Sequence, residues 1–173
     1  MKKILTVVMT VFFCFSGCEA AGPKPPIELP FAVHQAGATV STELRIANKY
    51  KYPFVLRFEY KEKDKADQER VRKLVGSGGK NKWTGNFIDP GIPIPLKLTI
   101  SIIESSEERT LLEKDVLALG QYAHGINYFE RDIDRNQIKI PPGLYRVTVQ
   151  SLKDIPELAN TKVFFVIRNP RGK

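Results

Sequence analysis

The chain has 173 residues, 42% of them apolar, and its 27 Lys and Arg against 19 Asp and Glu give a formal net charge of +8. This composition excludes wholesale disorder, and the length fits a single domain. Both cysteines, Cys14 and Cys18, lie near the N-terminus. A disulfide-stapled scaffold, a cysteine-ligated zinc and a catalytic thiol are therefore excluded from the remainder of the chain.

Residues 1–17 are predicted to form a lipoprotein signal peptide. Two lysines precede an apolar run over residues 4–15, which is too short for a permanent bilayer span of about 20 residues. The motif Phe-Ser-Gly-Cys that ends at Cys18 resembles the bacterial lipobox, in which the cysteine is acylated and the signal is cut just before it. We expect Cys18 to carry acyl chains such as palmitate and to anchor the protein in the lipid bilayer. The alternative is an ordinary signal peptide cut near residues 20–21.

The residue after the cysteine predicts a cellular location, and the prolines that follow predict a tether. Glu19 stands where enterobacterial sorting uses aspartate to retain lipoproteins in the inner membrane, so the resemblance implies the outer membrane and a periplasm-facing domain. Residues 18–30 are predicted to be a short, extended tether. The prolines that favour this are Pro23, Pro25, Pro26 and Pro30.

Residues 31–173 are predicted to form one domain built mainly of strands, because apolar and polar residues alternate with a period of two. The expected strands cover residues 39–48, 54–60, 94–104, 110–119, 137–140, 144–152 and 161–168. No alternation of strand and helix is present, so we predict an all-β fold, an antiparallel, immunoglobulin-like β-sandwich. A Pro-Pro-Gly turn followed by Tyr145 resembles the tyrosine corner of such sandwiches.

One segment has helical spacing instead. Residues 64–75 carry a sparse apolar stripe among charged residues, with Asp64 or Asp67 available as the N-cap and Gly76 at the C-terminal end. These features predict one short helix. A second helical or irregular stretch is expected within residues 120–134.

No motif indicates catalysis or a metal site. The only histidines, His34 and His124, lie far from any second ligand with zinc-site spacing, so we expect them to be structural or on the surface. The glycine-rich residues 76–80 follow a helix rather than a strand, and Asn81 stands where a phosphate loop needs Ser or Thr. We therefore expect no enzyme activity, no metal and no cofactor.

Two features suggest a surface that binds a partner. Basic residues gather between residues 49 and 82, where they could attract an acidic protein or anionic lipid headgroups, or form an ordinary solvated helix and its flanks. Aromatic residues gather in segments 49–54 and 120–129, and would form a rigid contact patch if exposed together with the single tryptophan. The candidate partner-binding residues are Tyr50, Tyr52, Arg70, Lys73, Trp83, Tyr122 and Tyr128.

The runs 44–60, 67–76, 91–98 and 142–147 resemble a family of small proteobacterial lipoproteins that carry a domain of unknown function. The resemblance covers about residues 30–170, implies a non-enzymatic lipoprotein and brings no binding residue with it. We predict a membrane-anchored protein-binding module, such as an immunity or inhibitor protein against a secreted toxin, with no nucleic-acid partner. The alternatives are an envelope-structural lipoprotein that binds lipid or peptidoglycan, and a glycan or lipid hydrolase whose carboxylates meet only in the fold.

Overall fold

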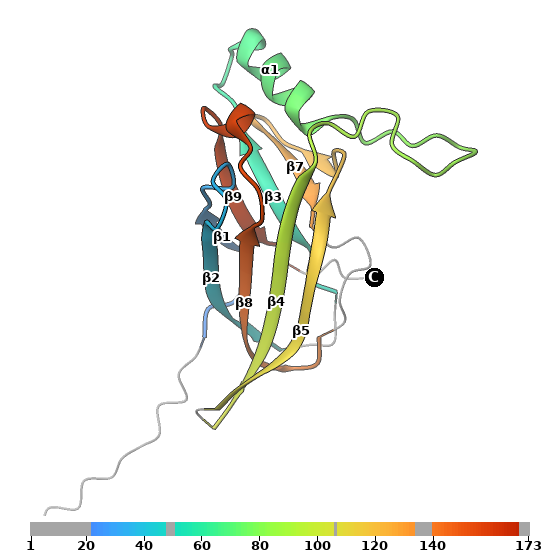
Figure 1. Cartoon of the computed structure of the whole chain (residues 1–173). Helices are drawn as coiled ribbons and strands as arrows, with labels where there is room; N and C mark the ends of the chain where they lie inside the picture. The colour runs from blue at the N-terminus through green and yellow to red at the C-terminus, as the bar shows by residue number, and fades with distance from the viewer. Residues whose placement is uncertain (1–21, 48–50, 106, 134–139, 170–173) are drawn as a thin grey trace, which may run out of the picture.

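The computed structural model describes residues 22–47, 51–105, 107–133 and 140–169 (Figure 1). Its strands are β1 (Ile27–Pro30), β2 (Thr39–Ile46), β3 (Phe54–Glu59), β4 (Ile94–Glu104), β5 (Glu107–Ala118), β6 (Ala123–His124), β7 (Tyr128–Asp132), β8 (Gly143–Ser151) and β9 (Lys162–Ile167). The helices are α1 (Lys65–Val75) and a single 3-10 turn (Pro156–Leu158). Within the described ranges, no helix has the length and apolar character needed to cross a membrane.

The strands form two antiparallel sheets with the orders β1-β9-β3-β7-β6 and β2-β8-β4-β5, which confirms the predicted sandwich. The sets β3-β7-β6 and β8-β4-β5 follow the B-E-D and F-C-C′ orders of an immunoglobulin domain. The terminal strands differ. The last strand, β9, lies beside β3, where an immunoglobulin domain has its first strand, and the early strand β2 lies beside β8, where that domain has its last.

The core lies between the two sheets and is built from the alternation that the sequence shows. In β4, Leu96, Leu98 and Ile100 are buried, while the residues between them are half-buried on the outer face. Leu98 pairs with Val149 of β8 and Ile100 with Val147, so the apolar faces of neighbouring strands coincide. Fully burying each such side chain contributes about 1.5–3 kcal/mol.

Helix α1 lies across one end of the sandwich, which we call the helical end (Figure 1). It begins after Asp64, whose side chain accepts the N–H of Asp67 at 3.0 Å, and it ends before Gly76, where φ is +78°. Val71 and Val75 are one turn apart and buried, and they join the core. The predicted helix is therefore confirmed, with its N-cap and its terminal glycine.

The predicted tyrosine corner is also present. The Tyr145 hydroxyl donates a hydrogen bond to the Pro141 carbonyl at 2.9 Å, and the side chain is completely buried. Burial raises the pKa of Tyr145, and the negative charge of Glu104 adds to this effect. The bond fixes the turn that leads into β8.

Two sequence predictions need correction. We expected the tether to extend to Pro30, but Ile27–Pro30 form β1 and pair with β9, because Ile27 can then be buried in the core. We also expected residues 120–134 to be helical or irregular, but they contain β6 and β7. Pairing with β3 favours the extended conformation there, since it buries Phe129. Most of the short strand expected over 137–140 lies outside the described residues.

Candidate functional site

Residues 77–91 form an ordered hairpin that projects from the helical end (Figure 1). An isolated β-bridge joins its two arms, and the Asn81 N–H donates to the Asn86 carbonyl at 2.7 Å. The Asn81 side-chain oxygen accepts the N–H groups of Trp83 and Thr84 at 2.8 and 3.1 Å. Such an asparagine-stabilised turn gives the hairpin tip a defined shape.

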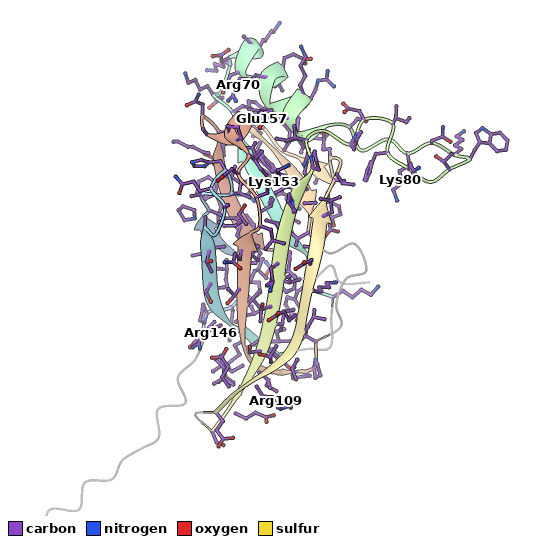
Figure 2. All side chains as sticks on the ribbon, viewed as in Figure 1. Arg70, Lys80, Arg109, Arg146, Lys153 and Glu157 are labelled. Atoms are coloured by element: carbon purple, nitrogen blue, oxygen red, sulfur yellow. The ribbon has the colours of Figure 1, made fainter. Side chains whose placement is uncertain are left out.

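Trp83 stands at this tip with 95% of its surface exposed. Figure 2 labels Lys80 on the same projecting hairpin. Ile88, in the returning arm, is 72% exposed. Lys80 and Lys82, which precede Trp83 in the chain, are also exposed. A large apolar side chain held away from the body of a protein is informative, because tryptophan is enriched among the residues that dominate binding interfaces.

Arg131 on β7 fixes the base of the hairpin. Its side chain is completely buried, and its guanidinium donates to the main-chain carbonyls of Leu74, Val75, Pro90, Ile92 and Ala118. Leu74 and Val75 belong to the last turn of α1. Pro90 lies at the C-terminal base of the hairpin, Ile92 lies just before β4, and Ala118 is the last residue of β5. Burial lowers the pKa of Arg131 to about 10, with Asp89 acting in the opposite direction, so the group is still charged at neutral pH.

The two basic candidates on α1 have different roles. The Arg70 guanidinium donates to Asp67 at 2.8 and 2.9 Å, to the Thr161 hydroxyl at 2.9 Å and to the Asn160 carbonyl at 3.3 Å. Arg70 therefore connects α1 to the loop before β9 through hydrogen bonds. Lys73 is exposed and remains a candidate for contact with a partner.

The three candidate tyrosines that the structure describes are buried or half-buried, in contrast to the exposed Trp83. Tyr52 is 4% exposed and belongs to the core before β3, so it does not meet the condition of exposure on which the predicted aromatic patch depends. The half-buried ring of Tyr128 lies beneath the Arg57 guanidinium at 4.3 Å, and Tyr122 is also half-buried. The two remaining candidates, Tyr50 and Cys18, lie outside the described residues.

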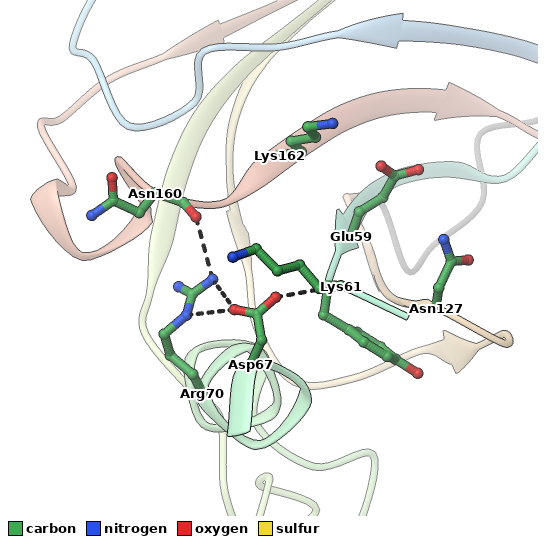
Figure 3. A pocket seen from close by; sticks show the side chains of 8 residues that line it. Glu59, Lys61, Asp67, Arg70, Asn127, Asn160 and Lys162 are labelled. Carbon is green, nitrogen blue, oxygen red and sulfur yellow. Dashed lines mark hydrogen bonds and ion pairs between the residues drawn. The ribbon is translucent and has the colours of Figure 1, made fainter. Parts of the chain in front are cut away.

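A second feature of the helical end is a pocket of about 560 Å³, formed where α1, the end of β3, the turn before β7 and the start of β9 meet (Figure 3). Its lining includes Glu59, Lys61, Asp67, Arg70, Asn127 and Lys162. The sequence analysis missed this pocket, because these residues come from four separate segments and no local pattern joins them. Among them only Arg70 had been singled out.

The acids of the pocket do not resemble a catalytic pair. Asp67 accepts the Lys61 main-chain N–H at 2.8 Å as well as the Arg70 guanidinium, and these contacts lower the pKa of Asp67. A carboxylate held ionised in this way is unsuited to act as a general acid. Among the described residues, no three His, Cys, Asp or Glu side chains gather where they could hold a metal ion.

The fold and the projecting hairpin define the class of protein. In its described residues it is an immunoglobulin-like β-sandwich with the helix α1 at one end and an exposed tryptophan. The chain belongs to the family described as Domain of unknown function (DUF5625), whose model matches residues 28–169, which confirms the expected membership of a family defined by such a domain. The chain is similar in fold to a protein from Sulfurospirillum deleyianum known from its crystal structure. That similarity has a TM-score of 0.71 at 23% identity and covers 84% of this chain and 98% of the other. No match is found among curated proteins.

Proposed function

We propose that this protein is a lipid-anchored, periplasm-facing binding module that presents Trp83 to a protein partner and catalyses no reaction. The observation that carries the proposal is the 95% exposed indole at the tip of an ordered hairpin. An exposed tryptophan offers a large apolar area and an N–H donor, both of which gain free energy when a partner buries them.

The order of the hairpin supports this role. The Asn81 side chain fixes the tip, and Arg131 fixes the base. Because the loop is already held in one shape, less conformational entropy is lost when it binds than for a loose loop of the same sequence. The hairpin therefore has the preorganisation expected of a docking element.

The charge near the hairpin supports an acidic partner. Lys80 and Lys82 closely precede Trp83 in the chain, and Lys73 is exposed on the adjacent helix. A basic surface of this kind accelerates association with an acidic protein, and the binding weakens as salt increases. An acidic toxin neutralised by this protein is one partner with that chemistry, and an acidic envelope protein is another.

The place where the described chain begins supports an arrangement in which the Trp83 hairpin is presented away from the anchoring membrane. The Pro23 carbonyl accepts the N–H of Arg45, near the end of β2, at 3.0 Å. This contact lies at the end of the sandwich opposite α1 (Figure 1). From Cys18, where we propose that the lipid is attached, to Gly22 the chain can span at most about 14 Å. The anchor would thus hold one end near the bilayer and leave the hairpin at the other.

The anchoring half of the proposal is tested with Cys18→Ser. The unaltered protein should sediment with membranes and carry the mass of acyl chains, whereas the variant should lose both properties, because the serine hydroxyl does not replace the acylated thiol. Fractionation and intact-mass spectrometry measure this. A variant that still sediments and still incorporates palmitate would contradict lipid attachment at this cysteine.

The binding half is tested with an acidic candidate partner, such as the product of an adjacent gene, titrated into the purified protein. Trp83 is the only tryptophan, so its emission reports directly on the site. We expect a blue shift on binding, and a loss of about 30-fold or more in affinity for Trp83→Ala. Leu117→Ala, at a half-exposed apolar position on β5, is the matched control. Equal affinity of Trp83→Ala and Leu117→Ala would rule out the hairpin as the contact, and a shift produced by lipid vesicles alone would favour the lipid-binding alternative.

A further inference from the structure

The pocket at the helical end contains charged side chains that make no hydrogen bond or ion pair within the described part of the chain. Asp67 and Arg70 are engaged with each other and with neighbouring groups, as described above. In contrast, the side chains of Glu59, Lys61 and Lys162 make no hydrogen bond or ion pair with any other described residue. The charged side chains of the lining are three cations and two carboxylates, so the pocket has an excess of positive charge. Its volume of about 560 Å³ is in the range of small-ligand sites.

Lys162 also borders a second hollow. Glu59 and Lys162 are direct neighbours in the β3–β9 register, and side chains alternate along a strand, so Lys162 and Phe164 share the outer face of this sheet. A groove of about 500 Å³ lies on this side and is lined by Lys162 and mainly by apolar residues. Those apolar residues are Pro30, Phe31, Ala32, Val163 and Phe164. Lys162 thus stands between a polar pocket and an apolar groove.

We propose that this pair of hollows binds the carboxyl terminus of a short peptide whose last side chain is apolar. Lys61 and Lys162 donate charge-assisted hydrogen bonds to the terminal carboxylate. Glu59 and the Asn127 side chain accept the peptide N–H groups, and the final side chain occupies the groove. The peptide N–H donors favour this ligand over a simple fatty acid, which would leave Glu59 beside a carboxylate with nothing to donate to it.

This inference goes beyond the proposed function and does not depend on it. Trp83 lies in the Asn81 turn at the tip of the hairpin and is not part of the pocket lining. A failed peptide experiment would therefore leave the Trp83 proposal intact, and Trp83→Ala should bind the peptide as well as the unaltered protein does.

The test is a titration of the ¹⁵N-labelled full chain in detergent micelles with acetyl-Ala-Ala-Leu, with the same peptide capped as its C-terminal amide, and with octanoate. We expect the side-chain amide signals of Asn127 to shift with the free acid, and the amide-capped peptide to bind at least about tenfold more weakly, because it offers no charged acceptor. The double variant Lys61→Gln/Lys162→Gln should lose binding. Lys73→Gln/Lys153→Gln removes the same charge from exposed positions outside the pocket and should retain it.

Three results would overturn the proposal. Equal binding of the free acid and the amide would show that no carboxylate is recognised. Octanoate binding as tightly as the peptide would refute the peptide as the ligand. Unchanged binding by Lys61→Gln/Lys162→Gln, with its other resonances in place to show that it is folded, would refute the two lysines as the site.

Discussion

Replacing Arg131 with methionine tests whether one buried side chain holds the Trp83 hairpin to the sandwich. Methionine keeps an unbranched apolar stem but has no charge and no N–H group. The five carbonyls bound by Arg131 would lose this donor at a place where the side chain is completely buried. The Leu74 and Pro90 carbonyls would keep the main-chain N–H groups of Ile92 and Gly120. Because the five carbonyls come from α1, from the base of the hairpin and from the end of β5, the loss affects all of these segments together.

The size of the effect follows from two opposing contributions. Leaving a buried hydrogen-bonding group without its partner typically costs about 1–3 kcal/mol, and Arg131→Met removes a donor from several carbonyls at once. The variant also recovers part of the desolvation cost that lowers the pKa of Arg131 to about 10. We therefore expect the free energy of unfolding to fall by about 3 kcal/mol. For a domain of this size the melting temperature would fall by roughly 6–12 °C.

Urea unfolding followed by circular dichroism measures the global loss, and amide hydrogen exchange over residues 77–91 measures the local one. The hairpin amides should exchange faster in Arg131→Met under conditions where the sandwich is still folded. Fluorescence anisotropy of Trp83 should fall, because the indole then moves more freely. Arg72→Met is the matched control, since Arg72 makes an ion pair with Glu69 on the surface of α1 and both side chains are about half exposed.

Two outcomes would refute this reasoning. If Arg131→Met and Arg72→Met unfolded at the same urea concentration, the buried guanidinium would contribute no more to the free energy of unfolding than an exposed one does. If the stability fell but hydrogen exchange in the hairpin stayed unchanged, Arg131 would support the sandwich without anchoring the hairpin. The stability of Arg131→Lys should lie between that of the unaltered protein and that of Arg131→Met, because an ammonium group has three donors for five acceptors.

Other substitutions test further parts of the structure. Tyr145→Phe should lower the free energy of unfolding by about 1–3 kcal/mol in urea, because it leaves the turn carbonyl without a donor, and an unchanged midpoint would argue against a role for the tyrosine corner. The pKa of Asp67 is lowered in the folded state, so its stabilisation is present at neutral pH and is lost as the pH falls through that pKa. Thermal melts of the unaltered protein and of Asp67→Asn should therefore differ at neutral pH and converge as the pH falls below the lowered pKa of Asp67, and a constant difference would exclude the charge as the cause. Gly91→Ala should destabilise more than Gly85→Ala, since both residues have positive φ but only at Gly91 would a Cβ collide with the buried guanidinium. Equal melting temperatures would contradict that contact.

The sequence determined those parts of the fold that depend on neighbouring residues. Alternation along β4 and β8 indicates which side chains are buried, and it does so without knowledge of the partner strand. The Asp64 cap and Gly76 mark the two ends of α1 because capping acts within a single turn. The Tyr145 corner is also local, because its hydroxyl reaches a carbonyl only four residues away.

The candidate site was predicted only in part. Trp83 is exposed, but nothing in its own segment shows whether a tryptophan in a glycine-rich loop is exposed or buried. The burial of Tyr52 could not be predicted either, because it depends on the core side chains that surround this residue. The role of Arg70 was also hidden, since its partners Asn160 and Thr161 lie about 90 residues away in the chain.

Only the tertiary structure decided how distant segments meet. The exchange of β2 and β9 relative to an immunoglobulin domain, the pocket built from four segments and the five carbonyls gathered around Arg131 all depend on non-local contacts. Arg131 shows this most clearly, since an arginine in a strand gives no sign that it will be completely buried. Its burial is tolerable only because the fold brings carbonyls from three separate stretches of chain to one place, and a periodic pattern within one segment cannot encode such an arrangement.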